Sequence, residues 1–365
     1  MANQFFNFTN FKKMAVMLRD HRPGQIFNTL RFASHALRGF PATHLPYDPH
    51  WLVLLITARC NLHCYICSFK NSSFKNPGCP HPVLRGFRDM TLDLFGQILD
   101  TYPRAIVVEL SGGEPLTNPG IFEMIHLAHA RRMKVHIPSN GTLLARNLEA
   151  MLQAPVEILN VSFYGTDAAS FAQATGADGS LFDATVEAVA ELARRRRTRG
   201  YPRCLRTSFV CTRDNLHLVP DFIRLSEKMG VDEVKLRNLR FHDIPSLPES
   251  SSLNADDPEL QDFLNGLRQQ RFRIPVFLPR LPRQDDRRKC DHPFRLVAID
   301  GDGFIGPCCV KADKRCWGNL MEQANLWNGP AMLQARRAHT DPNLPPPPLC
   351  WYCEERIPER LRLGG

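Results

Sequence analysis

The chain of 365 residues is long enough for one large α/β domain and a smaller second one. Its hydrophobic content of 43% and charged content of 23% are typical of a globular protein. No run of 18 apolar residues is present, which excludes a predicted membrane-spanning helix. The net charge of +9 invites a nucleic-acid partner, but the basic residues are spread along the chain, so none is expected.

Residues 1–50 are predicted to form an N-terminal helical extension. Within it, residues 11–40 show the apolar spacing of one or two amphipathic helices with basic faces. We expect these helices to pack on the following domain, with peripheral contact to an anionic membrane surface as the alternative. The first residues lack the features of a signal peptide, so a cytoplasmic location is expected. The twelve cysteines of the chain would then be reduced and suited to metal or redox work.

Residues 51–240 alternate short apolar runs with longer segments of helical spacing, the pattern of βα units around a parallel sheet. The predicted strands are Leu52–Thr57, Ala105–Leu110, Val135–Pro138, Ile158–Phe163, Arg206–Cys211 and Glu233–Leu236. The predicted helices are Leu92–Tyr102, Ile121–Arg132, Leu143–Gln153, Phe182–Arg197 and Leu218–Met229. Six such units suit an α/β fold with a partial (β/α)6 barrel, in which chemistry collects at the carboxyl ends of the strands.

Three cysteines, Cys60, Cys64 and Cys67, follow the first predicted strand. Thiolates favour soft metals such as zinc, copper(I) and iron–sulfur clusters. A structural zinc site or an ordinary cubane has four protein ligands, whereas this loop supplies three before Cys79. A metal core with one open position is therefore expected. The alternatives are a zinc knuckle that adds Cys79 or His63, and free structural thiols.

The spacing C-x3-C-x2-C, with the apolar residue Ile66 before the last cysteine, resembles the signature of the radical S-adenosylmethionine (SAM) superfamily. The resemblance implies a [4Fe–4S] cluster held by the three thiolates, with SAM bound at the open iron. It also implies an external one-electron reductant of the flavodoxin or ferredoxin type. Cleavage of SAM would give a 5′-deoxyadenosyl radical that abstracts a hydrogen atom from the substrate, within a partial (β/α)6 barrel.

Further cofactor-binding candidates lie at later strands. The stretch Gly112-Gly113-Glu114 resembles the family's GGEP element, which holds the methionine amino group of SAM through backbone groups and often the glutamate. By a similar resemblance, Asn140 lies beside the cofactor. Ser162 and Arg206 are candidates to bind the ribose or the carboxylate of SAM. Sheet hydrogen bonding and surface charge are the ordinary alternatives for these two.

Residues 241–285 are rich in proline and serine and are predicted to form a linker or lid around one helix, Asp257–Arg271. Residues 286–365 form a second module, in which an Asp-Gly turn within Leu296–Ile305 predicts a β-hairpin. Four thiolates there can close one site, for which zinc and a cubane fit the spacing equally. The four ligands are Cys290, Cys308, Cys350 and Cys353.

The order of Cys290, Gly303-x4-Cys308, a Gly-Asn-Leu sequence and Cys350-x2-Cys353 resembles the SPASM/twitch extension of radical SAM enzymes. The resemblance implies an auxiliary [4Fe–4S] cluster. The full SPASM pattern ends in further cysteines that do not follow Cys353 here, so one auxiliary cluster is expected. The hairpin ligand can instead be one of two nearby cysteines, Cys309 and Cys316.

The expected function is hydrogen abstraction from a small-molecule substrate, such as a sugar, a cyclitol or another natural product, followed by oxidation through the auxiliary cluster. Candidate bases for that oxidation are Lys235, Arg237 and His242. The alternative is a peptide maturase that forms a crosslink, or a radical epimerase. Candidate hydrogen donors for an epimerase are Cys204, Cys211 and Cys316. A non-catalytic zinc scaffold that binds nucleic acid is the distant alternative, and the three-cysteine loop argues against it.

Overall fold

The computed structural model describes residues 20–67, 87–239, 247–282, 290–308, 317–341 and 343–344, together with Cys350, Cys353 and residues 362–363. Four residues from the sequence predictions lie outside these ranges, namely Cys79, His242, Cys309 and Cys316.

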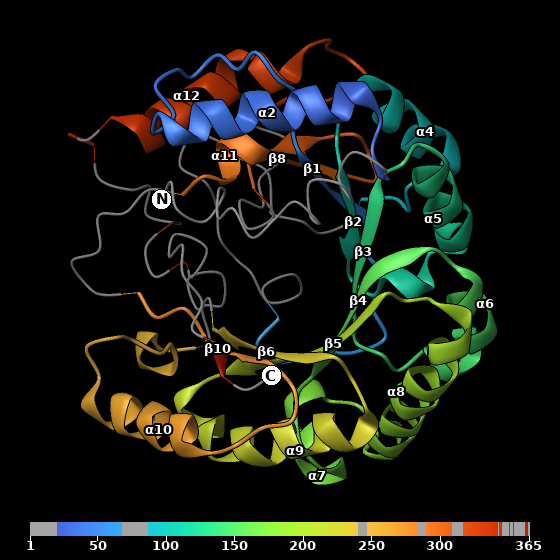
Figure 1. The fold of residues 1–365 in the computed structure, drawn as a ribbon, viewed down its shortest axis with the longest axis vertical. Helices are drawn as coiled ribbons and strands as arrows, with labels where there is room; N and C mark the ends of the chain where they lie inside the picture. Colours follow the sequence, from blue (N-terminus) through green and yellow to red (C-terminus); the bar gives the residue numbers. More distant parts are fainter. Residues whose placement is uncertain are drawn as a thin grey trace.

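One sheet of ten strands organises the described residues (Figure 1). The strands are β1 (Trp51–Thr57), β2 (Val107–Gly112), β3 (Lys134–Ser139), β4 (Val156–Phe163), β5 (Cys204–Cys211), β6 (Glu233–Asn238), β7 (Val276–Phe277), β8 (Leu296–Asp300), β9 (Ile305–Gly306) and β10 (Arg362–Leu363). Their order is β10-β7-β6-β5-β4-β3-β2-β1-β8-β9. All neighbours from β8 to β7 pair in parallel, and only the edge strands β9 and β10 are antiparallel. The predicted partial barrel is confirmed.

Helices cover the convex side of this curved sheet (Figure 1). They are α2 (Pro23–Leu37), α4 (Leu92–Thr101), α5 (Ile121–Ala130), α6 (Leu148–Gln153), α7 (Ala168–Thr175), α8 (Ser180–Arg199), α9 (Val219–Met229), α10 (Pro258–Gln269), α11 (His292–Arg295) and α12 (Pro330–Thr340). The described residues also include short 3-10 helices at Pro115–Thr117, Ala145–Asn147, Arg213–Leu218, Glu249–Ser251 and Leu326–Asn328. The sequence did not predict α7.

Alternation along the strands separates a core from a more polar inner face. On β5, Thr207 donates a hydrogen bond to Ser226 of α9, and Phe209 packs on Phe222 of the same helix with ring centroids 5.0 Å apart. The residues on either side of Thr207 are Arg206 and Ser208, which therefore face the concave side. The same alternation places further polar residues on this side, including Glu109, His136, Asn160, Ser162, Lys235 and Arg237.

The predicted C-terminal hairpin forms, and it belongs to the same sheet as the barrel. Strand β8 lies parallel beside β1, with Leu52 opposite Val297 and Leu54 opposite Ile299. Strand β9 then pairs with β8 in the antiparallel sense. The C-terminal hairpin is thus hydrogen-bonded to β1, the strand that precedes the three-cysteine loop.

Helix α2 packs over the amino-terminal ends of the strands. The buried Gln25 side chain donates hydrogen bonds to the carbonyls of Ala105 and Arg131, which precede β2 and β3. The buried Asn28 does the same to the carbonyl of Asp48, ahead of β1. The expected packing of the N-terminal helix on the barrel is therefore present, at the end opposite the cysteine loop.

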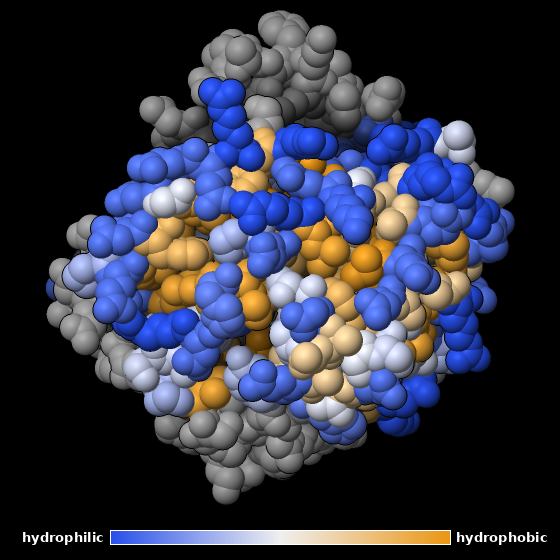
Figure 2. All heavy atoms as spheres, turned by 90° about the horizontal axis from the view of Figure 1, so that it is seen from below, coloured by the Kyte–Doolittle hydropathy of each residue, from blue (hydrophilic) through white to orange (hydrophobic). Residues whose placement is uncertain are grey.

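The outer helices present an ordinary mixed surface. Figure 2, seen from the side of α9 and α10, shows apolar side chains interspersed among polar ones. Apolar residues such as Leu225 and Phe263 are only partly buried there and pack against the core. In the part of the chain that the structure describes, no helix is long and apolar enough to cross a membrane.

Candidate iron–sulfur and SAM site

The three-cysteine loop begins three residues after β1 and is partly buried. Cys64 is buried, and Cys60 and Cys67 are half-buried. The pKa of the Tyr164 hydroxyl is raised well above its usual value, first by burial and then by the charges of the three thiols and of Glu114. Tyr164 therefore lies within electrostatic reach of all three cysteines, as their convergence on one metal core requires.

The donor set fits a cluster better than a single ion. Around one tetrahedral zinc, with Zn–S bonds near 2.3 Å, sulfur atoms lie within about 3.8 Å of one another. Among the described residues, the ligand atoms that lie within 4.8 Å of one another belong to Cys290, Asp291 and His292, not to the loop. Three soft sulfur donors spread more widely suit a core of several irons.

The unpredicted helix α7 fixes the cysteine loop. Its last two carbonyls, from Ala174 and Thr175, accept hydrogen bonds from the backbone N–H groups of Tyr65 (3.2 Å) and His63 (2.9 Å). A capping box at Asp167 begins this helix, and Gly176 ends it with φ of 66°. These caps are the sequence signal that could have revealed α7.

The glycine pair at the end of β2 makes room for the start of the cysteine loop. A Cβ atom at Gly112, where φ is 127°, would lie 2.2 Å from the carbonyl oxygen of Thr57. One at Gly113 would lie 2.1 Å from the carbonyl oxygen of Arg59. The N–H of Gly113 donates to the carbonyl of Thr57 (2.9 Å). The close backbone approach predicted here is therefore an approach to the chain's own loop. Binding of SAM by these glycines stays a prediction.

Glu114 is buried, with 1% of its surface exposed, and its carboxylate is already occupied by three donors. Oε1 accepts from the N–H of Leu116 (3.1 Å) and from the hydroxyl of Ser139 (2.8 Å), and Oε2 accepts from the N–H of Asn140 (2.7 Å). Burial raises the pKa of this carboxyl, and the three hydrogen bonds oppose the shift. The carboxylate joins the ends of β2 and β3 beside the loop, and its contact with the SAM amino group stays a prediction.

Asn140 reaches the cysteine loop directly. Its amide nitrogen lies 3.8 Å from Sγ of Cys60 and donates to Oδ1 of Asn61 (3.0 Å). Its amide oxygen accepts from the backbone and hydroxyl of Thr142, and Asn61 donates to the same hydroxyl (2.8 Å). Asn61 and Thr142 were not among the predicted residues. This network holds Cys60 against the end of β3.

Ile66 is half-buried within the loop, and the other two predicted cofactor residues, Ser162 and Arg206, lie on β4 and β5. Ser162, near the end of β4, has its hydroxyl 3.2 Å from that of Ser208 on β5. Arg206 lies five residues before the end of β5, roughly 16 Å along the strand, and donates to Glu233 of β6 (2.6 Å). Contact of these residues with SAM stays a prediction, which the ion pair of Arg206 does not support.

The C-terminal cysteines form a second group. The pKa of the buried Cys290 thiol is raised well above its usual value by burial, and also by Asp291, Cys353 and Cys308, so these groups lie within electrostatic reach of one another. The N–H of Cys353 donates to the carbonyl of Cys350 (3.3 Å). The four predicted auxiliary ligands thus belong to one region of the structure.

Two histidines missed by the sequence analysis join this group. The N–H of His292 lies 3.4 Å from Sγ of Cys290, and Nε2 of His339 lies 3.7 Å from Sγ of Cys350. Both histidines are buried. The contact of His292 is local, since its backbone N–H lies two residues after Cys290, whereas His339 lies 11 residues before Cys350 and only the folded chain could reveal its contact.

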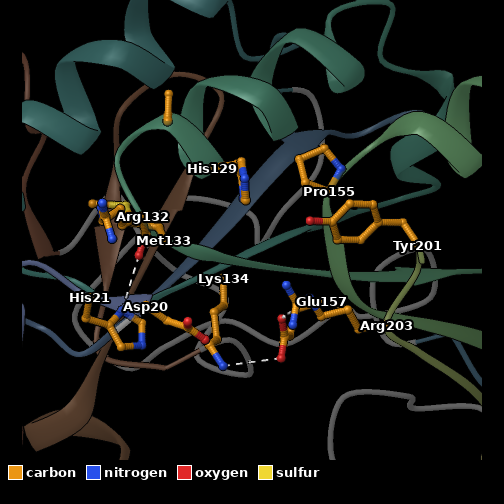
Figure 3. A pocket seen from close by; sticks show the side chains of 11 residues that line it. Asp20, His21, His129, Arg132, Met133, Lys134, Pro155, Glu157, Tyr201 and Arg203 are labelled. Carbon is orange, nitrogen blue, oxygen red and sulfur yellow. Dashed lines mark hydrogen bonds and ion pairs between the residues drawn. The ribbon is translucent and has the colours of Figure 1, made fainter. Parts of the chain in front are cut away.

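A separate pocket of about 400 Å³ lies between the amino-terminal ends of β3 and β4 (Figure 3). Lys134 and Arg203 both face Glu157 there, at 3.3 and 3.7 Å, and His21 bonds to the carbonyl of Arg132. Because parallel strands carry the cysteine loop at their opposite ends, this pocket is not the SAM site.

Comparison with known proteins agrees with this geometry. The radical SAM superfamily model matches residues 54–225, and the SPASM iron–sulfur cluster-binding domain matches residues 290–354. A tungsten-containing aldehyde ferredoxin oxidoreductase cofactor-modifying protein of Pyrococcus furiosus is 27% identical over 271 residues, 71% of this chain and 70% of that protein. A PqqA peptide cyclase of Rhodopseudomonas palustris is 24% identical over 274 residues, 71% of this chain and 67% of that protein.

Solved structures share the fold. SuiB of Streptococcus suis bound to its precursor peptide SuiA matches with a TM-score of 0.61 and 15% identity, covering 86% of this chain and 72% of SuiB. Histidine-tagged anSMEcpe with bound AdoMet matches with a TM-score of 0.55 and 17% identity, covering 78% of this chain and 79% of that one. The two family matches indicate a SAM-binding [4Fe–4S] cluster and auxiliary iron–sulfur chemistry rather than a zinc scaffold, and ligation by the individual cysteines stays a prediction. The chain belongs to the radical SAM superfamily and carries a C-terminal SPASM iron–sulfur domain.

Proposed function

We propose that this radical SAM enzyme matures a peptide by forming a crosslink within it. The similarity to a PqqA peptide cyclase over 71% of the chain supports a peptide substrate, and so does the fold shared with SuiB, whose structure holds a precursor peptide. The sugar, cyclitol or natural-product substrate expected from the sequence has less support.

The observation that carries the proposal is that Ala58, two residues before Cys60, and Cys308 pack against one apolar cluster on the inner face of the sheet. On β1, Leu52, Leu54 and Ile56 belong to the main core. The alternate residues Val53 and Leu55 form a second apolar cluster, on the inner face, and Cys308 packs against it. One substrate on this face can therefore approach both the three-cysteine loop and the auxiliary ligands.

The bound cluster and SAM supply a 5′-deoxyadenosyl radical, formed with one electron from an external flavodoxin- or ferredoxin-type reductant. A substrate carbon that loses a hydrogen atom can then bond to a second atom of the same peptide. That step expels one proton and one electron, so a base and an electron acceptor must both lie nearby. Cys290, Cys308, Cys350 and Cys353 would hold the acceptor.

Candidate proton acceptors lie on the same face. Burial, followed by the charges of Arg206, Lys134 and Lys235, lowers the pKa of His136 to about 4, so this imidazole is neutral near pH 7. Its ring lies edge-on to Trp51 of β1, with centroids 5.7 Å apart. The predicted bases Lys235 and Arg237 lie on the inner face of β6. Because burial and these cations oppose protonation, His136 is a weaker base than an ordinary imidazole.

Deuterium transfer tests the substrate class. Anaerobically prepared protein would be incubated with SAM, dithionite and deuterated peptides encoded near its gene. Transfer of deuterium into 5′-deoxyadenosine, with loss of a pair of hydrogen atoms from the peptide, is the expected result. The Cys60/Cys64/Cys67→Ala variant is the control and should give neither. Deuterium transfer from a sugar or cyclitol carbon instead would refute the peptide substrate.

A further inference from the structure

Helix α2 presents an apolar stripe to solvent. Phe27, Leu30 and Leu37 are 65%, 49% and 45% exposed. With 100° of rotation per residue, these three side chains and Ser34 fall on one side of the helix. The opposite side is buried on the barrel and includes Gln25, Asn28, Phe32, Ala33 and His35.

Exposed arginines border this stripe. Arg31 and Arg38 lie at its edge, and Arg22 precedes the helix. Arg31 donates to the carbonyl of Pro46 (3.1 Å), and Arg38 donates to the carbonyl of Ser34 (3.1 Å). Because both acceptors are uncharged, these hydrogen bonds do not neutralise the two guanidinium groups. No acidic residue occurs between His21 and Tyr47. The surface is therefore both apolar and cationic.

The helix cannot turn this stripe inward. Gln25 and Asn28 on its buried side are bonded to backbone carbonyls ahead of β1, β2 and β3, and turning would break these buried hydrogen bonds. The stripe also lies at the end of the sheet opposite the cysteine loop. A partner bound here would leave the catalytic end open.

We infer that the exposed face of α2 docks the protein on an anionic lipid surface. A helix that lies in a membrane interface buries apolar side chains at the acyl boundary, while its basic residues meet lipid phosphates. Phe27, Leu30 and Leu37 supply the first kind of contact, and Arg31 and Arg38 supply the second. This inference does not depend on the identity of the enzyme's substrate.

Vesicle binding by the full chain tests the inference. We expect the protein to sediment with vesicles of phosphatidylcholine and phosphatidylglycerol, to sediment much less with phosphatidylcholine alone, and to be released by salt. The triple variant Phe27→Ser/Leu30→Ser/Leu37→Ser should bind about tenfold more weakly. Leu92→Ser/Met321→Ser is the matched control, since it removes exposed apolar residues elsewhere and should bind as the wild type does.

Two other occupants of the stripe would give different results. If the triple variant melts at a lower temperature and the wild type ignores vesicles, another segment of this chain covers the stripe. If the variant instead changes the mass of the protein in sedimentation, a second copy covers it. Either result overturns the inference, as does equal binding by wild type and triple variant.

Discussion

Glu114 shows how a single residue can be predicted correctly in place while its surroundings stay hidden. Its position after a predicted strand follows from the sequence, but the three donors around its carboxylate come from its own turn and from the end of β3. Spacing along the chain reveals which residues follow a strand. It does not reveal which side chains a neighbouring strand brings to them.

Replacing Glu114 by Gln should destabilise the protein by about 1–3 kcal/mol, because an amide NH2 would face a backbone N–H or a hydroxyl that now donates to the carboxylate. Binding of SAM should weaken as the ends of β2 and β3 separate. Thermal melting and equilibrium dialysis with SAM measure the two effects. Glu123→Gln on the exposed face of α5 is the control, and an equal change in both variants would contradict the expectation.

His339 gives a prediction for the auxiliary site. Its Nδ1 donates to the carbonyl of Ala335 (2.8 Å), which directs Nε2 toward Cys350. The buried Arg336 holds the same helix to α11 through the carbonyl of Pro293 (2.8 Å). We expect His339→Phe to lose iron to a chelator roughly tenfold faster, because the partner that orients Cys350 is gone.

Iron release would be followed in the Cys60/Cys64/Cys67→Ala background, where only the C-terminal site can hold a cluster. His44→Phe changes an exposed histidine and serves as the control. Unchanged release from the His339 variant would show that His339 merely fills space.

His50 predicts a pH dependence of stability. Its Nε2 lies 2.9 Å from the hydroxyl of Thr29, and burial, followed by Arg295, lowers its pKa from 6.5 to about 4. Between these values the unfolded chain binds a proton that the folded chain does not. The contribution of His50 to the free energy of unfolding is therefore fully present above pH 6.5, and it is lost as the pH drops toward 4. Melting temperatures should fall less steeply over this range in His50→Gln, and an identical slope would contradict the assignment.

At the scale of elements, the strands and most helices could be predicted because their apolar periodicity and caps are strong. Thr91 caps α4 and Gly230 ends α9. Helix α7 has only eight residues and follows a loop from β4, so periodicity alone is weak there. Its contact with the cysteine loop arises from the folded chain, and no local pattern encodes it.

Gly113→Ala tests how the end of β2 supports the cysteine loop. The added methyl group would meet backbone atoms of Arg59, which cannot move without displacing the loop. We expect loss of most of the iron bound by the loop, with the auxiliary site retained, so that about half of the total iron remains. Iron analysis and electron paramagnetic resonance measure this. Gly96→Ala, where the nearest side-chain atom is 4.0 Å away, should keep all iron.

At the scale of the whole molecule, the sequence suggests a barrel and a separate C-terminal module, and the structure joins them in one sheet. Five residues of β1, from Trp51 to Leu55, pair with β8. The cysteine spacing predicts both iron–sulfur sites but not this pairing, because strands from distant parts of a chain leave no shared pattern in the sequence. The adjacency of β8 and β1 places the hairpin that leads to Cys308 beside the strand that leads to the three-cysteine loop.

The final prediction separates the role of the auxiliary cluster from the role of the strand beside it. Cys350→Ala/Cys353→Ala should keep the fold and a melting temperature close to that of the wild type, because β8 and β9 carry neither residue. Deleting residues 290–365 should instead make the protein aggregate, since it would expose the apolar edge of β1. Size-exclusion chromatography and circular dichroism compare the two. A soluble, monomeric deletion variant with unchanged melting would mean that the barrel is stable without β8, and that the shared sheet serves only to place the second cluster.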